Sequence, residues 1–100
     1  MAYEYALIAL ADPTRRSLFE ALAAEPAPVG RLAERLPVSR PAVSQHLKVL
    51  SDAGLVTLEK RGTRHIYAVR REGLAGLRAW LDGLWGDVLT SFAEDMEKDA

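Results

Sequence analysis

The segment SRPAVSQHLKVL, from Ser39 to Leu50, has the pattern of a short helix whose two faces differ in chemistry. On a helical wheel, Val43, Leu47 and Leu50 fall within one narrow stripe that can pack on a core. The outward positions form a second set: Arg40, Pro41, Ser44, Gln45, Lys48 and Ser51. Arginine and glutamine can make paired hydrogen bonds to base edges in the major groove of DNA, while serine and lysine suit phosphates. The segment therefore suits a DNA-contacting helix, although an ordinary amphipathic surface helix has the same pattern.

The sequence before this segment predicts three further helices, over residues 2–11, 13–24 and 29–36. Asp12 and Pro13 form a helix start, because aspartate is a favoured N-cap and proline suits the first helical position. The two prolines of the stretch Glu25-Pro26-Ala27-Pro28 end the second helix and separate it from the third. Only Pro37-Val38-Ser39 then separates the third helix from the next one, which Ser39 caps. This is the short connection that a helix-turn-helix needs.

The sequence after the segment predicts a β-hairpin and a long last helix. Gly54 ends the preceding helix, and strands follow at residues 55–61 and 64–69. Gly62 and Thr63 between them suit a type II′ turn, which requires glycine at its first position. The last helix starts near residues 71–73, continues into the 90s and is expected to fray after Glu94. We therefore expect one mainly α domain over residues 1–100, a winged helix-turn-helix with four helices, two strands and a fifth helix.

Basic residues gather at the predicted hairpin tip, which contains Lys60, Arg61, Arg64 and His65. Arg61 and Arg64 flank the two-residue turn and should lie opposite each other, where like charges destabilise a hairpin. An anion between the two arginines would reverse that effect. The favoured interpretation is a wing that grips phosphates or inserts an arginine into a minor groove. The alternative is a solvated edge whose charges prevent aggregation.

The charge of the chain is concentrated in its middle. The net charge is −1, but residues 31–71 carry nine basic and three acidic side chains. Residues 1–30 carry two basic and four acidic ones, and residues 72–100 carry two basic and seven acidic ones. A basic middle between acidic ends is expected if one face meets a polyanion and the rest avoids it. Double-stranded DNA is therefore the predicted partner.

The last helix carries more apolar surface than one core contact uses. Its apolar positions span an arc of about 180°, whereas a single core contact needs about 100°. Exposed on a monomer, two tryptophans and a phenylalanine would form an unusually large apolar patch. A two-fold homodimer is expected, with a wholly intramolecular core as the alternative. The residues expected at the dimer interface are Tyr3, Tyr5, Leu7, Leu77, Trp80, Leu81, Leu84, Trp85, Val88 and Phe92.

Three segments together resemble the ArsR family of winged-helix bacterial transcriptional repressors: LADPTRRSLFEAL (Leu10–Leu22), PVGRLAERLPVSRPAVSQHLKVLSDAGLV (Pro28–Val56) and GTRHIY (Gly62–Tyr67). The resemblance implies a homodimer, joined through its first and last helices, that binds an inverted repeat in its own or a neighbouring promoter. Matched position by position, it implies DNA contacts from the recognition helix at Ser39, Arg40, Pro41, Ser44, Gln45, His46 and Lys48. It implies further contacts from the wing at Lys60, Arg61, Thr63 and Arg64.

No metal site or cofactor is expected. Many relatives sense metals or arsenic through cysteines before the recognition helix, or through histidines and carboxylates on the last helix. Here the first region is PVGRLAERL, without cysteine, and the last helix has carboxylates but no histidine. Carboxylates alone would bind a transition metal weakly and unselectively. The sequence does not identify an effector.

Other function classes fit less well. A winged-helix module that binds protein instead of DNA is the main alternative. An enzyme is not expected, because the chain has no cysteine, no plausible Ser–His–Asp constellation and no phosphate-cradling glycine loop. No secretory signal or run of about 18 apolar residues is present, so a cytoplasmic location without membrane contact is expected.

Three residues have two candidate roles each. Arg15 and Arg16 open a helix at the end that disfavours cations. Salt bridges with Glu20 and Glu4 are the favoured interpretation, ahead of a contact with DNA phosphate. His46 falls beside the apolar stripe of its helix, so a packing or capping role and a phosphate contact are equally open.

Overall fold

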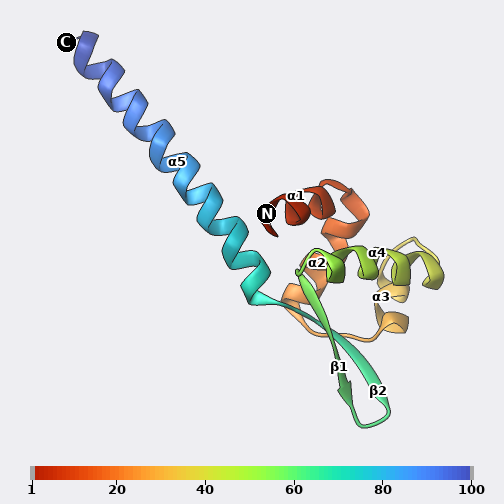
Figure 1. The fold of residues 1–100 in the computed structure, drawn as a ribbon. Coiled ribbons are helices and arrows are strands. Elements are labelled where there is room, and N and C mark those ends of the chain that lie inside the picture. The colour runs from red at the N-terminus through yellow and green to blue at the C-terminus, as the bar shows by residue number, and fades with distance from the viewer. Residues whose placement is uncertain (1, 100) are drawn as a thin grey trace.

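The element order is the one that the sequence predicts (Figure 1). The computed structural model describes residues 2–99, with side-chain surroundings from Tyr3 to Glu97. It contains four helices, two strands and a last helix: α1 (Ala2–Ala11), α2 (Pro13–Ala24), α3 (Val29–Arg35), α4 (Arg40–Asp52), β1 (Val56–Arg61), β2 (Arg64–Val69) and α5 (Arg71–Asp99). The two strands form one antiparallel hairpin, the wing. The predicted winged helix-turn-helix fold is confirmed.

Local signals determine where the helices begin. Asp12 precedes α2, and its Oδ1 accepts a hydrogen bond from the main-chain N–H of Arg15 at 3.0 Å. Ser39 precedes α4, and its Oγ accepts from the N–H of Ala42 at 3.3 Å. Each side chain therefore satisfies one of the N–H groups that the first turn of a helix leaves without a partner.

The end of α4 is a Schellman motif centred on Gly54. This glycine has a φ of 77°, and its N–H donates to the carbonyl oxygen of Ser51 at 2.9 Å. The N–H of Leu55 donates to the carbonyl oxygen of Leu50 at 3.0 Å, and both leucine side chains are fully buried. The motif satisfies carbonyls at the helix end and turns the chain directly into β1.

The wing has the predicted register and turn. Arg61 lies opposite Arg64 across the hairpin. Gly62 has a φ of 65°, whereas Thr63 does not have a positive φ. A type I′ turn needs a positive φ at both central residues, so the turn is type II′, as expected.

The base of the wing is tied to the helices by a contact that the sequence did not predict. Ala27, between α2 and α3, forms an isolated β-bridge with Tyr67 of β2. The Ala27 N–H donates to Tyr67 O at 3.0 Å, and the Tyr67 N–H donates to Ala27 O at 2.9 Å. Pro26 and Pro28 favour an extended backbone here, so the helix breaker also joins the wing through a one-residue bridge.

The core lies where α2, α3 and α4 meet the base of the wing. Its largest fully buried side chains are Leu18, Leu22, Leu32, Val43, Leu47, Leu50, Leu55 and Val56. The apolar stripe predicted for α4 is therefore buried in full. This packing leaves the opposite face of α4 in solvent.

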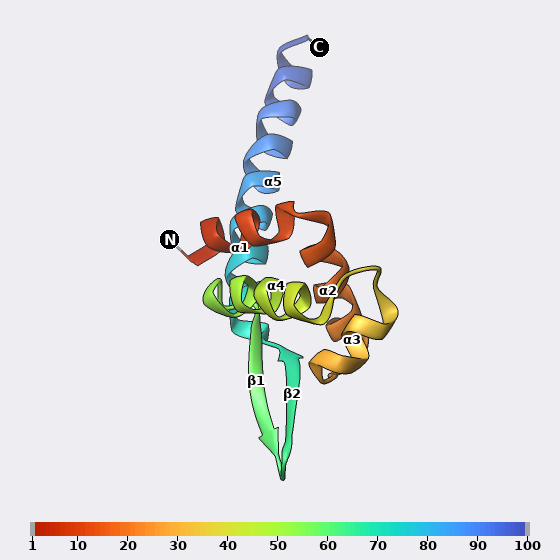
Figure 2. The ribbon, with the colours of Figure 1, turned by 90° about the vertical axis from the view of Figure 1, so that its right-hand side faces the viewer.

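The last helix runs away from the core and from the wing (Figures 1 and 2). Instead of fraying after Glu94, α5 continues as helix to Asp99. The chain measures 65 × 26 × 22 Å and has a radius of gyration of 17.7 Å. A compact domain of this length would have a radius of gyration of about 13 Å. Most of α5 therefore has no packing partner within the described chain.

Among residues 2–99, no helix combines the length and apolarity that crossing a bilayer would require.

Candidate nucleic-acid interface

The recognition helix α4 presents its polar face to solvent. The side chains predicted to contact DNA are exposed at six positions: Ser39, Arg40, Pro41, Ser44, Gln45 and Lys48. In Figure 2, α3 and the wing both lie on the same side of α4, and the first turns of α4 lie above the space between them. The fold therefore brings the beginning of the recognition helix and the wing to one face of the molecule.

A groove on this face combines residues from three elements. It has a volume of about 440 Å³ and is lined by Pro28, Val29, Arg40, Ser44, Arg64 and His65. Arg40 and Ser44 come from α4, whereas Arg64 and His65 come from the wing tip. No lining residue is acidic. The groove therefore combines two permanent positive charges with hydrogen-bond donors, which is the chemistry that a phosphate requires.

Arg40 lies over the beginning of α3. A Cβ added to Gly30 would stand 3.2 Å from Arg40 Nη2 and 3.4 Å from Arg40 Cζ. The guanidinium therefore occupies space that Gly30 leaves free. Nothing in the periodicity of the sequence marks Gly30, because this contact joins two helices.

Four of the cations at the interface differ in their partners. Arg61 donates to the carboxylate of Glu59, with Nη2 and Oε2 3.0 Å apart. This ion pair is exposed and compensates part of the charge at the tip. By contrast, Arg40, Lys48 and Arg64 form no ion pair within the described part of the chain. These three remain available for an external anion.

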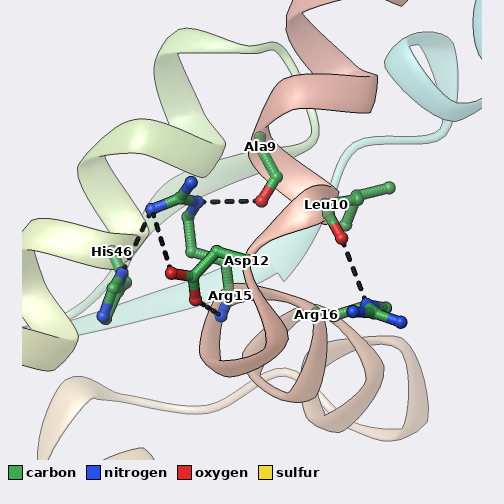
Figure 3. A network of polar contacts seen from close by, with 6 residues as sticks. All are labelled: Ala9, Leu10, Asp12, Arg15, Arg16 and His46. Atoms are coloured by element: carbon green, nitrogen blue, oxygen red, sulfur yellow. Dashed lines mark hydrogen bonds and ion pairs between the residues drawn. The ribbon is translucent and has the colours of Figure 1, made fainter.

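Arg15 joins the α1–α2 corner to the recognition helix (Figure 3). Its Nε donates to the carbonyl oxygen of Ala9 at 2.8 Å, and its Nη1 lies 3.9 Å from Asp12 Oδ2. The same Nη1 is 3.5 Å from Nδ1 of His46. His46 is only half-exposed and is turned toward this corner. Its packing role is thus the one that the structure supports.

The ion pairs expected for Arg15 and Arg16 are replaced by helix capping. Arg16 Nε donates to the carbonyl oxygen of Leu10 at 3.1 Å, as Arg15 does to that of Ala9. The expected partners Glu20 and Glu4 are not involved in either contact. The physical reason is that the last carbonyls of α1 carry partial negative charge and need donors, and the sharp turn at Asp12 brings both arginines to them.

The residues predicted for the dimer interface fall into two groups. Tyr3 and Trp80 stack on each other within the chain, with ring centroids 5.2 Å apart and planes 9° from parallel, and Leu77 packs against the core. The other residues are exposed in the single chain: Tyr5, Leu7, Leu81, Leu84, Trp85, Val88 and Phe92. The structure thus uses one edge of the apolar arc of α5 to hold α1 and leaves the rest uncovered.

The described residues contain no group of three or more His, Cys, Asp or Glu side chains placed to bind a metal ion.

A helix-turn-helix with an exposed recognition helix, a basic wing and a shared groove defines a winged-helix DNA-binding domain. The family model described as a helix-turn-helix domain matches residues 10–59, which run from the end of α1 into β1. The chain is 53% identical over 91 residues to the HTH-type transcriptional regulator Rv2034 of Mycobacterium tuberculosis, covering 91% of this chain and 85% of the relative. Several further relatives are named as transcriptional repressors.

Solved structures agree with this assignment. An ArsR-like transcriptional regulator from Rhodococcus sp. RHA1 superposes with a TM-score of 0.82 at 29% identity, covering 92% of this chain and 87% of that one. Mb0332 from Mycobacterium bovis, described as a homodimeric winged helix-turn-helix DNA-binding domain and a possible ArsR-family regulator, superposes with a TM-score of 0.68. Its identity is 26%, and the match covers 86% of this chain and 80% of that one. The chain belongs to the ArsR family of winged helix-turn-helix transcriptional regulators.

Proposed function

We propose that this chain represses transcription by binding, as a homodimer, to an inverted repeat in operator DNA. The observation that carries the proposal is the open polar face of α4 beside a basic wing, with α5 directed away from both (Figure 1). One side of the molecule thus offers groups suited to DNA, while a separate helix offers apolar surface suited to a second copy. Repression would follow because a dimer that occupies a promoter excludes other proteins from it.

The exposed apolar residues of α5 support pairing between two copies. Leu74, Leu81 and Val88 recur at the heptad interval, as do Trp85 and Phe92. Trp85 and Phe92 are 56% and 63% exposed in the single chain. Each Å² of apolar surface that pairing removes from water contributes about 25 cal/mol. The homodimeric state of the related domain Mb0332 also supports this arrangement.

The two-fold symmetry of such a dimer determines the form of its operator. Two recognition helices would enter successive major grooves, about 34–36 Å apart, so the operator would be an inverted repeat. Gln45, exposed on α4 and outside the groove, is the side chain that we assign to base edges. Lys48 on α4 and Lys60, Arg61 and Thr63 on the wing would contact the DNA backbone.

The remaining assigned residues would act at the edges of this contact. Ser39 and Pro41 begin α4, so their contribution is to place the first turn of the helix against the DNA. His46 would pack against Arg15 on the side of α4 that faces away from the DNA, and it would not contact DNA itself. Because the ligand is chromosomal DNA, the cytoplasm of a bacterium is the location that we propose.

The decisive experiment selects bound fragments from genomic DNA and maps the protected bases. We expect a protected inverted repeat, with half-site centres one helical turn apart and a stoichiometry of two chains per site. Sedimentation without DNA should show a dimer. A protein that protects no sequence even at low salt would refute the proposal and leave the protein-binding module as the better explanation. A protein that binds the operator as a single chain would refute the proposed homodimer.

A further inference from the structure

We infer that Arg40 of α4 and Arg64 of the wing bind one and the same backbone phosphate, and that Gly30 of α3 makes this possible by leaving room for the Arg40 guanidinium. The inference rests on the proposed DNA-binding function and deepens it. It assigns Arg40 to the DNA backbone, although its position on the recognition helix alone would equally suit a base contact.

The shared groove is the first observation. Arg40 and Arg64 come from different elements, yet both line the same space of about 440 Å³, together with Ser44 and His65. Neither arginine forms an ion pair with any described residue. Two arginines that line one groove with no carboxylate among its lining residues repel each other. A bound phosphate removes this repulsion, because each guanidinium can donate two hydrogen bonds to it.

The position of Arg40 is the second observation. Its guanidinium lies against the beginning of α3, 3.2 Å from the point where a side chain at Gly30 would begin. The side chain is thus turned toward α3 and also lines the groove beside the wing. A residue of this kind is placed to hold the backbone that passes between recognition helix and wing, while Gln45 remains free for the bases.

Gly30 has a positioning role in this arrangement. A Cβ at 3.2 Å from Nη2 is closer than an ordinary van der Waals contact, so the Arg40 side chain would have to shift by a few tenths of an ångström. Glycine within a helix otherwise disfavours folding relative to alanine. A substitution Gly30→Ala should therefore leave the fold intact or slightly more stable while it displaces Arg40.

The first test measures how affinity depends on salt, with a duplex carrying the selected operator and a scrambled duplex of the same length. Arg40→Ala and Arg64→Ala should each weaken both duplexes by the same factor, because a backbone phosphate carries no sequence information. The double variant of the homodimer loses this site in both half-sites, so the slope of log affinity against log salt should decrease by about 1.8, or about 0.9 for one phosphate per protomer. A decrease of about 3.6, expected if the two arginines of each protomer contact separate phosphates, would overturn the inference. A loss confined to the operator in Arg40→Ala would overturn it as well.

The second test places Gly30→Ala in the wild-type and the Arg40→Ala backgrounds. Alone it should weaken both duplexes threefold to tenfold, with a thermal midpoint at or above that of the wild type. In the Arg40→Ala background it should cause no further loss. Equal losses in both backgrounds would show that Gly30 does not act through Arg40. Gly76→Ala on α5 is the matched control, because a Cβ there meets no atom within 4 Å.

These outcomes also separate the inference from the function on which it rests. A wild-type protein that binds neither duplex refutes the proposed function itself. If the wild-type protein binds the operator but the salt slope of the Arg40/Arg64 double variant fits two phosphates per protomer, only the shared phosphate is refuted.

Discussion

Arg15 Nη1 lies 3.5 Å from His46 Nδ1, which connects the second helix to the back of the recognition helix. The same guanidinium donates to Ala9 O, at the end of the helix that carries part of the proposed dimer surface. One side chain of α2 therefore contacts both α1 and α4. The orientation of α4 against α1 depends on this junction as well as on the leucine core.

Replacing Arg15 tests the junction. Arg15→Met should lower the free energy of unfolding by about 1–3 kcal/mol, because it leaves part-buried acceptors without their charged donor. Arg16→Met is the matched control, since Arg16 donates to the neighbouring carbonyl of Leu10 from an exposed position. It should lose less than about 1 kcal/mol. Urea denaturation measures the free energy of unfolding of both variants. Equal losses of free energy would contradict a special role for Arg15.

The cap of α2 makes stability depend on pH. The main-chain N–H of Arg15, which donates to Asp12, holds the pKa of that carboxyl below its usual 3.8, and the Arg15 guanidinium adds to the effect. Because the folded pKa is lowered, this stabilisation is complete above the usual value and is lost as the pH falls through the folded pKa. Asp12→Asn keeps a capping oxygen but does not titrate. Its unfolding free energy, measured by urea titrations between pH 7 and pH 3, should fall less steeply than that of the wild type below pH 4. A variant with the full wild-type loss would contradict the prediction.

Gly73 is required where α5 begins. A Cβ on Gly73 would overlap the main-chain oxygen of Gly54, next to the point where the Arg70 N–H donates to Leu55 O at 2.8 Å. Gly73→Ala should therefore destabilise the protein by about 1–3 kcal/mol or more, because main chain must move. Gly76→Ala, in open space on the same helix, should instead stabilise it by about 0.5–1 kcal/mol. Thermal unfolding midpoints compare the stability of the two variants. Equal midpoints would show that the main chain at Gly54 can move away from a Cβ on Gly73 at little cost in free energy.

The exposed stripe of α5 should control assembly. Trp85→Glu should raise the dimer dissociation constant by more than tenfold, since burying an aromatic side chain contributes about 2–3 kcal/mol per protomer. Thr90→Glu, which the helical repeat places on the far side of α5, is the control and should leave the dimer intact. Sedimentation equilibrium gives both constants. An unchanged dimer in Trp85→Glu would remove this stripe from the interface.

Gln45 should determine sequence preference. Gln45→Ala is expected to weaken operator binding by about 1–3 kcal/mol while scrambled DNA is bound almost as before, because the lost hydrogen bonds are to base edges. Competition binding at a fixed salt concentration measures the ratio of the affinities for the operator and for the scrambled duplex. An equal loss on both duplexes would place Gln45 on the backbone instead.

Local chemistry made several elements predictable. The N-caps at Asp12 and Ser39, the end of α4 at Gly54 and the turn at Gly62 each depend on residues within a few positions of one another. The register that sets Arg61 opposite Arg64 follows from the length of that turn. Double-stranded DNA as the partner followed from the clustering of charge along the chain.

Contacts between distant residues were not predictable in this way. The bridge between Ala27 and Tyr67 and the space at Gly30 each join segments whose spacing along the chain carries no signal. The same limit explains Arg15 and Arg16. Their charges suggested carboxylate partners, whereas the corner at Asp12 brings them to the carbonyls of α1.

The sequence by itself determined the order of the helices, the starts of α2 and α4, the end of α4 and its inward face, because caps, prolines, glycines and apolar periodicity act locally. Only the tertiary structure decided which way the cations point and which apolar residues of α5 are used within the chain. Trp80 stacks on Tyr3, while Trp85, one and a half turns further along, remains in solvent. Both tryptophans belong to one apolar arc, but Trp80 lies at the edge of the arc that α1 covers and Trp85 does not.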